Sequence, residues 1–431
     1  MRKPSLLVVF LTVFIDLIGF GIVLPLLPIY ARDFGLGFTP TVRGLIVGVV
    51  MCSYSAMQFL FAPGWGRLSD RIGRRPVLLV STAGAAVSYA VFAIGSGFGG
   101  TLALAIVFGS RVLAGVCGAN ITVAQAYIAD ITPPDQRSKK MGLIGMAFGL
   151  GFIFGPVLGG LSLKHFGNTG PGWVAAALCA ANFLLAVFVL PESWKPSADH
   201  APQRPRLSQW LHTMSHPKVG LLIAVYFLAT FCFSCFETTL GLLVSDNFHL
   251  DIHEERSASA VTYLFAYCGI IGALVQGGAI GRLVKKMGEP RLIAFSLVLV
   301  AIGLAPVPFI HGQENLSWKM LLQREGLPWV QLLLVLGVLS IGSSLTRPPV
   351  FGLMSILTPA HEQGATIGVA QSAGSLARIV GPLFASLVYH FKPSIVYLTC
   401  AFISALTAVW TWQALCKPGQ PVVVGDVQGV R

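Results

Sequence analysis

Long apolar stretches constrain the fold of this chain more than any other feature of its sequence. A helix needs about 20 apolar residues to cross the ~30 Å hydrocarbon core of a bilayer, and twelve such stretches follow one another. Because every backbone N–H and C=O group must find a partner inside the lipid, each stretch predicts a membrane-spanning helix. The expected spans cover residues 6–28, 43–63, 77–97, 102–123, 141–163, 172–191, 219–243, 259–281, 292–311, 329–354, 365–388 and 394–415.

The charge content excludes a soluble globular domain. Only 11% of the residues are charged, whereas a soluble domain carries about 25%. The net charge of +12 does not indicate a nucleic-acid partner, because the cations form short clusters between the apolar stretches rather than a basic stripe. We therefore expect an all-α membrane protein with twelve transmembrane helices, surrounded by a lipid bilayer.

The distribution of Lys and Arg predicts the orientation in the membrane. With a cytoplasmic N-terminus, the inner loops and termini hold 19 of these residues and the outer loops hold 7. Cytoplasmic loops are enriched in Lys and Arg, so we expect both termini in the cytoplasm, in a multi-pass protein of the bacterial inner (plasma) membrane. The first apolar run reaches about Leu27 and contains Asp16, which predicts an uncleaved first helix rather than a signal peptide.

The two halves of the chain repeat each other. Gly66-Arg-Leu-Ser-Asp-Arg-Ile-Gly73 resembles Gly281-Arg-Leu-Val-Lys-Lys-Met-Gly288 at an offset of 215 residues, and Gly155-Pro156 recurs as Gly381-Pro382 at an offset of 226. Parallel repeats predict two pseudo-symmetric six-helix bundles around a central cavity. The expected division is 1–191 for the N-terminal bundle, 192–218 for a cytoplasmic linker, 219–416 for the C-terminal bundle and 417–431 for a disordered cytoplasmic tail.

Five charged side chains fall inside the expected spans, where each costs about 2.5–3.5 kcal/mol on insertion scales. Asp16 lies about 15 Å into the first span at 1.5 Å per residue, where a carboxyl group could take up and release a proton, and Arg111 could pair with it. Arg378 could be the counter-ion of Glu237 or meet an anionic substrate, whereas Arg347 could lie near the inner surface. The cost predicts proton or substrate handling for each, with a structural ion pair as the alternative.

Four amide side chains in or directly next to the expected spans could line the cavity. Amides in such places either line a polar cavity or hydrogen-bond neighbouring helices, and the sequence leaves both interpretations open. These residues are Asn120, Gln125, Gln276 and Gln371.

Four motifs carry a resemblance to a known family. They are Asp16–Pro28 in the first span, Gly66–Pro76 after the second, Arg111–Ala119 in the fourth and Gly151–Gly160 in the fifth. On these residues the chain resembles the major facilitator superfamily, and within it the twelve-helix drug/proton antiporters, especially the tetracycline-efflux-like proteins.

The resemblance implies a cytoplasmic gating loop. In that picture Asp70 lies against the start of the eleventh span, near Gly364–Thr366, because a helix N-terminus stabilises an acid. Arg71 and Arg74 would complete a charge network that latches the two halves together. The residues of this loop are Gly66, Asp70, Arg71, Gly73 and Arg74.

The resemblance also implies a helix-packing motif in the fifth span, of the kind associated with export. Its glycines would let helices approach closely, and its proline could kink the helix. The residues are Gly151, Gly155, Pro156, Gly159 and Gly160.

Two features depart from the family pattern. Lys285 stands in the second-half copy of the loop where the first half has Asp70, and the expected ninth span has no acidic residue. Tetracycline pumps are expected to carry an acid in that span. Either Glu237 takes over its role, or the substrate differs.

Motifs for nucleotide-driven or enzymatic chemistry are absent from the sequence, which contains no G-x-x-x-x-G-K-[ST] loop and no H-E-x-x-H motif. We expect no enzyme, metal or cofactor, and a proton gradient as the energy source. The prediction is a monomeric secondary active transporter that exports a small amphipathic organic compound or drug in exchange for protons by alternating access. One alternative is an uptake or facilitated carrier for an endogenous organic solute or anion, and another is a transporter-like receptor or scaffold.

Overall fold

The structure is a computed structural model that describes residues 6–23, 26, 27, 30, 39–118, 120–194, 206–250, 255–312 and 326–416. Within these ranges all regular secondary structure is helical, and twelve candidate spans are long and apolar enough to cross a membrane. The predicted all-α class with twelve spans is therefore confirmed.

The N-terminal half contributes the first six spans, of which the fourth consists of two consecutive helices, α5 and α6. A short 3-10 turn, Pro134–Gln136, precedes the fifth. The helices are α1 Leu6–Val23, α3 Pro40–Ile72, α4 Arg74–Ser96, α5 Gly100–Cys117, α6 Asn120–Ile131, α7 Arg137–Phe166 and α8 Gly170–Val189.

The C-terminal half contributes the other six spans, and a short helix, α9 (Arg206–Ser215), precedes them. The eighth span consists of α11, a π-helical turn at Val275–Ala279 and α12. A 3-10 turn, Ala360–Glu362, precedes α15. The helices are α10 Pro217–Phe248, α11 Glu255–Leu274, α12 Ile280–Met287, α13 Glu289–Leu304, α14 Leu327–Leu357, α15 Gln363–Tyr389 and α16 Pro393–Leu415.

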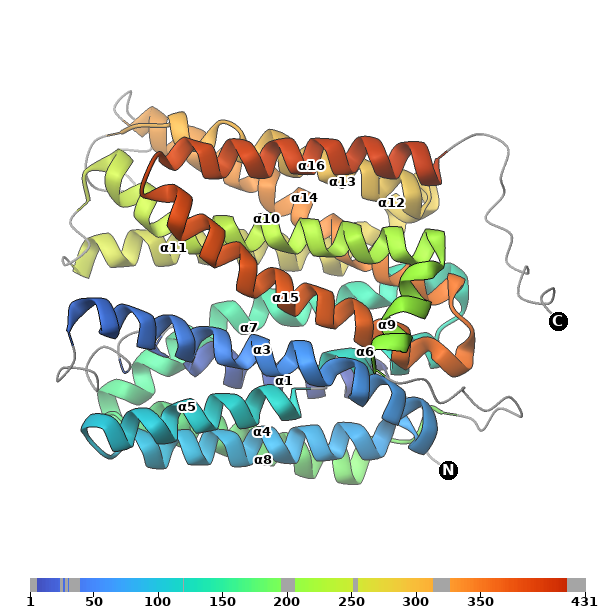
Figure 1. The fold of residues 1–431 in the computed structure, drawn as a ribbon, viewed down its shortest axis with the longest axis horizontal. Coiled ribbons are helices and arrows are strands. Elements are labelled where there is room, and N and C mark those ends of the chain that lie inside the picture. Colours follow the sequence, from blue (N-terminus) through green and yellow to red (C-terminus); the bar gives the residue numbers. More distant parts are fainter. Residues whose placement is uncertain are drawn as a thin grey trace.

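The two halves lie side by side as two layers of helices, which the chain colours separate in Figure 1. α3 packs along α15, and α7 packs against α14 and α11, so these helices form the interface between the halves. α1 begins and α16 ends at the same end of the bundle, on the right in Figure 1. We call this the inner end, because the Lys and Arg distribution predicts that it faces the cytoplasm.

Glycine permits the close approach of α3 and α15. A Cβ placed on Gly66 would overlap the carbonyl oxygen of Gly364, and a Cβ on Gly368 would lie 2.7 Å from the carbonyl oxygen of Ala62. Backbone therefore meets backbone at the inner end of this interface, which is possible only where side chains are absent.

The outer surface of the bundle is apolar. Phe188 is 72% exposed, Leu387 is 69% exposed and Phe402 is 63% exposed. Exposed apolar surface of this kind is unfavourable in water, and it suits a helix that faces lipid.

The gating loop expected at residues 66–74 is helical except at Gly73, because α3 continues to Ile72 and α4 begins at Arg74. Gly73 has a φ of +100°, which glycine adopts without the strain that other residues incur. Hydropathy marks only the lipid-embedded part of a helix, so it misses polar turns that continue beyond the lipid. The domain boundaries stay a prediction, and residues 195–205 of the linker and the tail 417–431 lie outside the described residues.

Candidate functional site

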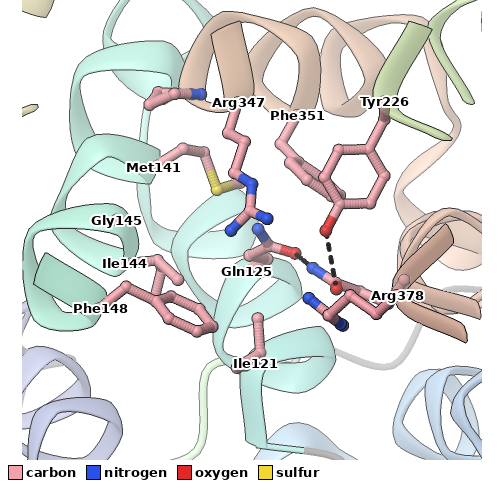
Figure 2. A pocket seen from close by; sticks show the side chains of 12 residues that line it. Ile121, Gln125, Met141, Ile144, Gly145, Phe148, Tyr226, Arg347, Phe351 and Arg378 are labelled. Atoms are coloured by element: carbon pink, nitrogen blue, oxygen red, sulfur yellow. Dashed lines mark hydrogen bonds between the residues drawn. The ribbon is translucent and has the colours of Figure 1, made fainter. Parts of the chain in front are cut away.

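A small central cavity lies between the two halves. Figure 2 shows side chains from α6, α7, α10, α14 and α15 pointing into it. Its apolar wall includes Phe148 and Phe351, and Arg347 and Arg378 are the only charged residues among the described ones that line it. The lining comprises Ile121, Gln125, Met141, Ile144, Gly145, Phe148, Tyr226, Arg347, Pro348, Phe351, Gln371 and Arg378.

Two of the four amides selected from the sequence meet in this cavity. Gln371 Nε2 of α15 donates to Gln125 Oε1 of α6 at 2.9 Å, and the Tyr226 hydroxyl donates to Gln371 Oε1 at 3.2 Å. All three side chains are buried or nearly so. The hydrogen bond between Gln371 and Gln125 joins the two halves across the cavity wall.

Arg347 lies within the cavity and not at the inner surface, which decides between the two positions that the sequence left open. Its guanidinium carbon lies 5.7 Å from the ring centroids of both Phe148 and Tyr226. Cations at such distances are attracted to aromatic faces. One ring comes from each half, so Arg347 is held between the halves.

Arg378 reaches from α15 to the opposite half. Its Nη2 donates to Gln58 Oε1 of α3 at 3.0 Å and to Ser375 Oγ at 3.4 Å, while Ser375 Oγ donates to the same Gln58 oxygen at 2.9 Å. Glu237 on α10 lies within electrostatic reach of Arg378 and Arg347. In the part of the chain that the structure describes, no ion pair joins Glu237 to either arginine, so Arg378 is not its direct counter-ion.

Asp16 and Arg111 share a second polar site within the N-terminal half. Both exert an electrostatic influence on the hydroxyl groups of Tyr54 and Tyr89, and the Asn120 side chain lies within hydrogen-bonding reach of Asp16. This arrangement places Asp16, Arg111 and Asn120, which the sequence selected separately, around two tyrosines.

Arg111 does not form the ion pair with Asp16 that the sequence suggested, although both residues are described. It is 2% exposed, and its guanidinium carbon lies 5.0 Å from the ring centroid of Tyr54 and 6.0 Å from that of Phe20. Its buried Nε has no hydrogen-bond partner among the described residues. Aromatic faces therefore replace a carboxylate as the immediate neighbours of this cation.

Gln58 and Tyr54 connect the two polar sites, and sequence reasoning missed both. Gln58 Nε2 donates to the Gly118 carbonyl oxygen at 3.2 Å and approaches the Tyr54 hydroxyl at 3.5 Å, while its Oε1 accepts from Arg378. Gln58 is 4% exposed. An amide in the apolar second span was the sequence signal that could have revealed it.

Gln276 lies outside the central cavity, in the π-helical turn. Its Nε2 donates to the Ser344 carbonyl oxygen at 3.3 Å, and its side chain packs on Gly145 of α7. The sequence left open whether Gln276 lines the cavity or hydrogen-bonds a neighbouring helix. In the structure it hydrogen-bonds a neighbouring helix.

Asp70 lies at the N-terminus of α15, where the family resemblance implied that it would lie. Its carboxylate accepts hydrogen bonds from the Gly364 N–H at 2.9 Å and the Ala365 N–H at 2.7 Å. The first N–H groups of a helix have no partner within the helix and favour an acid. The contact ties α3 of the first half to α15 of the second.

Arg74 holds Asp70 in a network of contacts within the first half. Its side chain is fully buried and pairs with Asp70, while its Nε donates to Asp130 Oδ2 at 2.9 Å and its Nη1 to Ser69 Oγ at 2.8 Å. Glu192 accepts from the backbone N–H groups of Arg74 and Arg75 at 2.9 and 3.0 Å. Neither Asp130 nor Glu192 was predicted as a partner from the sequence.

Arg71 does not belong to this network. Its side chain is exposed, and it forms no ion pair or hydrogen bond within the described part of the chain. In this structure it therefore does not complete the latch that the family resemblance implied.

The equivalent contact at the inner end of the second half has different chemistry. Ser138 at the start of α7 donates to Glu289 Oε1 of α13 at 3.1 Å, and Arg137 donates to the Ser355 carbonyl oxygen of α14 at 2.7 Å. Lys285 is exposed and makes no such bond in the described ranges. α13 begins at Glu289, so the ninth helix has an acid after all, at its inner end.

The glycine motif of α7 packs against α1. Backbone atoms of Leu17, Gly21 and Ile22 lie within 3.1 Å of where a Cβ on Gly151, Gly155 or Gly159 would sit. Gly160 faces open space, so it takes no part in this packing. Pro156 lies inside α7.

Fold and site together define the class: a multi-pass helical membrane carrier whose two halves meet around a central cavity. The chain belongs to the major facilitator superfamily, because the profile of the Major Facilitator Superfamily matches residues 9–382. It is therefore a transporter of that superfamily and not an enzyme.

The relatives include tetracycline resistance proteins and Major facilitator superfamily domain-containing proteins. The chain is 32% identical to the Tetracycline resistance protein, class E, of Escherichia coli over 88% of this chain and 86% of that protein. It is 29% identical to the bovine (Bos taurus) Major facilitator superfamily domain-containing protein 10 over 93% of this chain and 90% of that protein. The crystal structure of the human organic anion transporter MFSD10 (TETRAN) is similar with a TM-score of 0.77 and 26% identity, covering 95% of this chain and all of that one.

Proposed function

We propose that the chain is a proton-coupled exporter that exchanges protons for a small amphipathic organic compound by alternating access. The observation that carries this proposal is a set of polar side chains that crosses the interface between two carboxyl groups, Asp16 in one half and Glu237 in the other, each within electrostatic reach of one end of the set. This path consists of Tyr54, Gln58 and Arg378, and the contact between Gln58 and Arg378 joins the two halves.

The path links protonation to the interface through Arg378. Its guanidinium donates to Gln58 of the opposite half, and the Glu237 carboxyl of its own half lies within electrostatic reach. A charged carboxylate attracts a guanidinium and a protonated one does not. The protonation state of Glu237 therefore sets how strongly Arg378 is drawn away from Gln58, which couples a proton to the contact between the halves.

The inner end is closed in this conformation. Asp70 holds the start of α15, Ser372 Oγ of α15 donates to the Phe59 carbonyl oxygen of α3, and Arg378 reaches Gln58 further along the same pair of helices. At 1.5 Å per residue, these contacts cover roughly the inner half of the bundle. Opening this end requires breaking each of them, which is the rocking motion expected of two repeated halves.

The cavity wall suits an amphipathic compound. Phe148, Phe351 and Ile144 offer apolar and aromatic surface, while Gln125 and Gln371 offer amide groups. A few polar groups in a largely apolar pocket are typical of sites for small organic molecules. The name of the Escherichia coli relative, a tetracycline resistance protein, supports the export of such compounds.

A second candidate is a carrier for an organic anion. Arg347 and Arg378 line the cavity and no described carboxylate does so, and such a cavity favours a negatively charged group. The name of the human relative, an organic anion transporter, supports this candidate. Its direction could be uptake or facilitated exchange as well as export.

The proposal further includes a monomer in a bacterial inner membrane with both termini in the cytoplasm. Accessibility of single cysteines at positions 139 and 164, which lie at opposite ends of α7, tests the orientation. Labelling of position 164 and not 139 from outside intact cells is the expected result.

Reconstituted protein in proteoliposomes tests proton coupling. Under an imposed pH gradient, a panel of amphipathic anions, cations and neutral compounds is scored for substrate flux and for proton movement with an internal pH dye. Asp16→Asn and Glu237→Gln should each lower proton-driven flux by roughly tenfold or more, while exchange of labelled for unlabelled substrate without a gradient persists. Asp135→Asn, at an exposed acid before α7, is the matched control. Normal proton-driven flux in both acid variants would refute proton coupling.

Substrate charge separates the two candidates. If the cavity selects an anion, Arg347→Gln weakens transport of anionic compounds and spares neutral ones, and counterflow proceeds equally with and without a pH gradient. If the chain is a proton-coupled exporter of neutral or cationic compounds, flux follows the gradient and Arg347→Gln does not select by charge.

A further inference from the structure

Exposed cations gather at the inner end of the second half, around α12. None of them forms an ion pair or hydrogen bond within the described part of the chain. Two acids, Asp135 and Glu289, lie on the same segments and do not pair with them either, which leaves the surface with a net charge of about +3. The five cations, which we call the α12 patch, are Lys139, Arg282, Lys285, Lys286 and Arg291.

The amphipathic character of α12 keeps its three cations on the surface. Ile280 is buried, and Leu283, Val284 and Met287 pack around it against Leu292 and Leu345. With the apolar side of this two-turn helix directed inward, Arg282, Lys285 and Lys286 remain exposed. The helix lies at the end of the eighth span, so these cations lie where the lipid-embedded part of the bundle ends.

A lipid-facing stripe on α13 leads to the same patch. Phe295 is 44% exposed, Val298 is 42% exposed and Ile302 is 58% exposed. They follow Arg291 at intervals of 4, 7 and 11 residues, which places all four on one helical face. Arg291 therefore lies at the inner end of a stripe that contacts acyl chains, at the depth of the lipid headgroups.

The copy of this segment in the first half presents no such surface. There Arg74 is fully buried between Asp70 and Asp130, and the Arg75 side chain donates to the Val187 carbonyl oxygen at 2.7 Å. Arg74 and Arg75 of the first-half copy thus bind the protein's own acids and carbonyl groups, and Arg71 is a single exposed cation there. The five cations of the α12 patch, by contrast, are all left for a partner outside the chain.

We propose that the α12 patch binds the headgroups of anionic phospholipids in the inner leaflet. Negative headgroup charge complements the patch, and the adjoining stripe of α13 accommodates the acyl chains, which a soluble anion or an acidic peptide lacks. Lys139 belongs to the first half and the other four cations to the second. The stem of Lys139 crosses to α12, since a Cβ on Gly281 would lie 2.7 Å from its Cδ. A bound headgroup therefore bridges the halves and favours the closed inner end.

Lipid binding to the purified full chain tests this proposal. Detergent-solubilised protein is titrated with phosphatidylglycerol or phosphatidylcholine, and bound lipid is counted by native mass spectrometry. Lys285→Gln/Lys286→Gln removes two charges from the patch. The matched control, Lys164→Gln/Lys392→Gln, removes two exposed charges from the opposite end of the bundle. Size-exclusion profiles verify that all variants remain folded.

We expect the wild type to prefer phosphatidylglycerol and the patch variant to lose roughly thirtyfold in affinity for it, since each Lys or Arg near an anionic surface contributes about 1 kcal/mol. The control should retain its affinity, because its two charges lie away from the patch. Equal binding of both lipids by the wild type would overturn the proposal. Equal losses of affinity in the two variants would also overturn it, because binding would then follow total charge. Complete displacement of the lipid by inorganic phosphate would overturn it as well, because the site would then take a soluble anion.

Discussion

The inner ends of the two halves use the same spacing with opposite charges. Asp70 and Arg74 in the first half correspond to Lys285 and Glu289 in the second, each at the repeat offset of 215 residues. Each half therefore keeps one acid and one cation four residues apart, and their order is reversed.

The reversal changes what each acid can hold. Asp70, in the last turn of α3, reaches the free N–H groups of α15 and accepts two hydrogen bonds there. Glu289, in the first turn of α13, accepts one hydrogen bond from the Ser138 hydroxyl of α7. A carboxylate on backbone N–H groups at a helix N-terminus is the stronger contact. Both copies of the repeat thus place an acid in contact with the opposite half. The contact between α3 and α15 is the stronger of the two.

The largest expected effect tests that strength directly. Asp70→Asn removes the charge at the N-terminus of α15 and leaves the buried Arg74 with one acid fewer, and breaking a buried ion pair costs about 3–5 kcal/mol. We expect substrate flux in proteoliposomes to fall by more than tenfold. Membrane insertion and the size-exclusion profile should be unchanged, because the twelve spans do not depend on this contact. Flux within twofold of the wild type would refute the latch.

The glycines of the two copies sharpen the comparison. A Cβ on Gly66 would overlap the backbone of α15, whereas a Cβ on Gly281 would meet only the stem of Lys139. Since a flexible side chain can move and a packed helix cannot, Gly66→Ala should lower flux by roughly tenfold and Gly281→Ala by less than twofold. Equal effects of the two substitutions would show that the halves are not packed as described.

The second-half contact should be weaker than its counterpart. Glu289→Gln keeps a hydrogen-bond acceptor for Ser138 and removes only its charge, and a single hydrogen bond contributes about 1 kcal/mol. We expect flux to fall by two- to threefold, with Ser138→Ala giving a similar result. A loss as large as that of Asp70→Asn would mean that both latches are equally strong and that the charge reversal is without consequence.

The sequence was sufficient to predict the spans and the position of Asp70. Twelve apolar stretches can pair their backbone N–H and C=O groups in lipid only as helices. The family motif that contains Asp70 implies that this acid lies at the start of α15. The partners of Arg74 were not predictable, because Asp130 and Glu192 follow it by 56 and 118 residues. Only the folded chain brings such distant positions together.

Among the polar residues of the apolar spans, the deeply placed charged ones and four amides were recognised, and Gln58 was overlooked. Asp16, Arg111 and Glu237 stood out by the cost of burying a charge, whereas Gln58, which joins Arg378 to the first half, did not. Glu289 was missed because hydropathy began the ninth span at residue 292, three residues after the helix begins. The miss of Glu289 comes from treating apolar length as the whole of a helix.

The smallest expected effect concerns Arg71, which shares the motif with Asp70 and Arg74 but not their contacts. Its side chain is exposed and makes no bond in the described ranges, and surface substitutions of this kind change little. Arg71→Gln should therefore leave flux within twofold of the wild type, measured beside Asp70→Asn in the same proteoliposomes. A loss comparable to that of Asp70→Asn would mean that Arg71 enters the network in another conformation of the transport cycle. In that case the latch would be larger than the inner-closed structure shows.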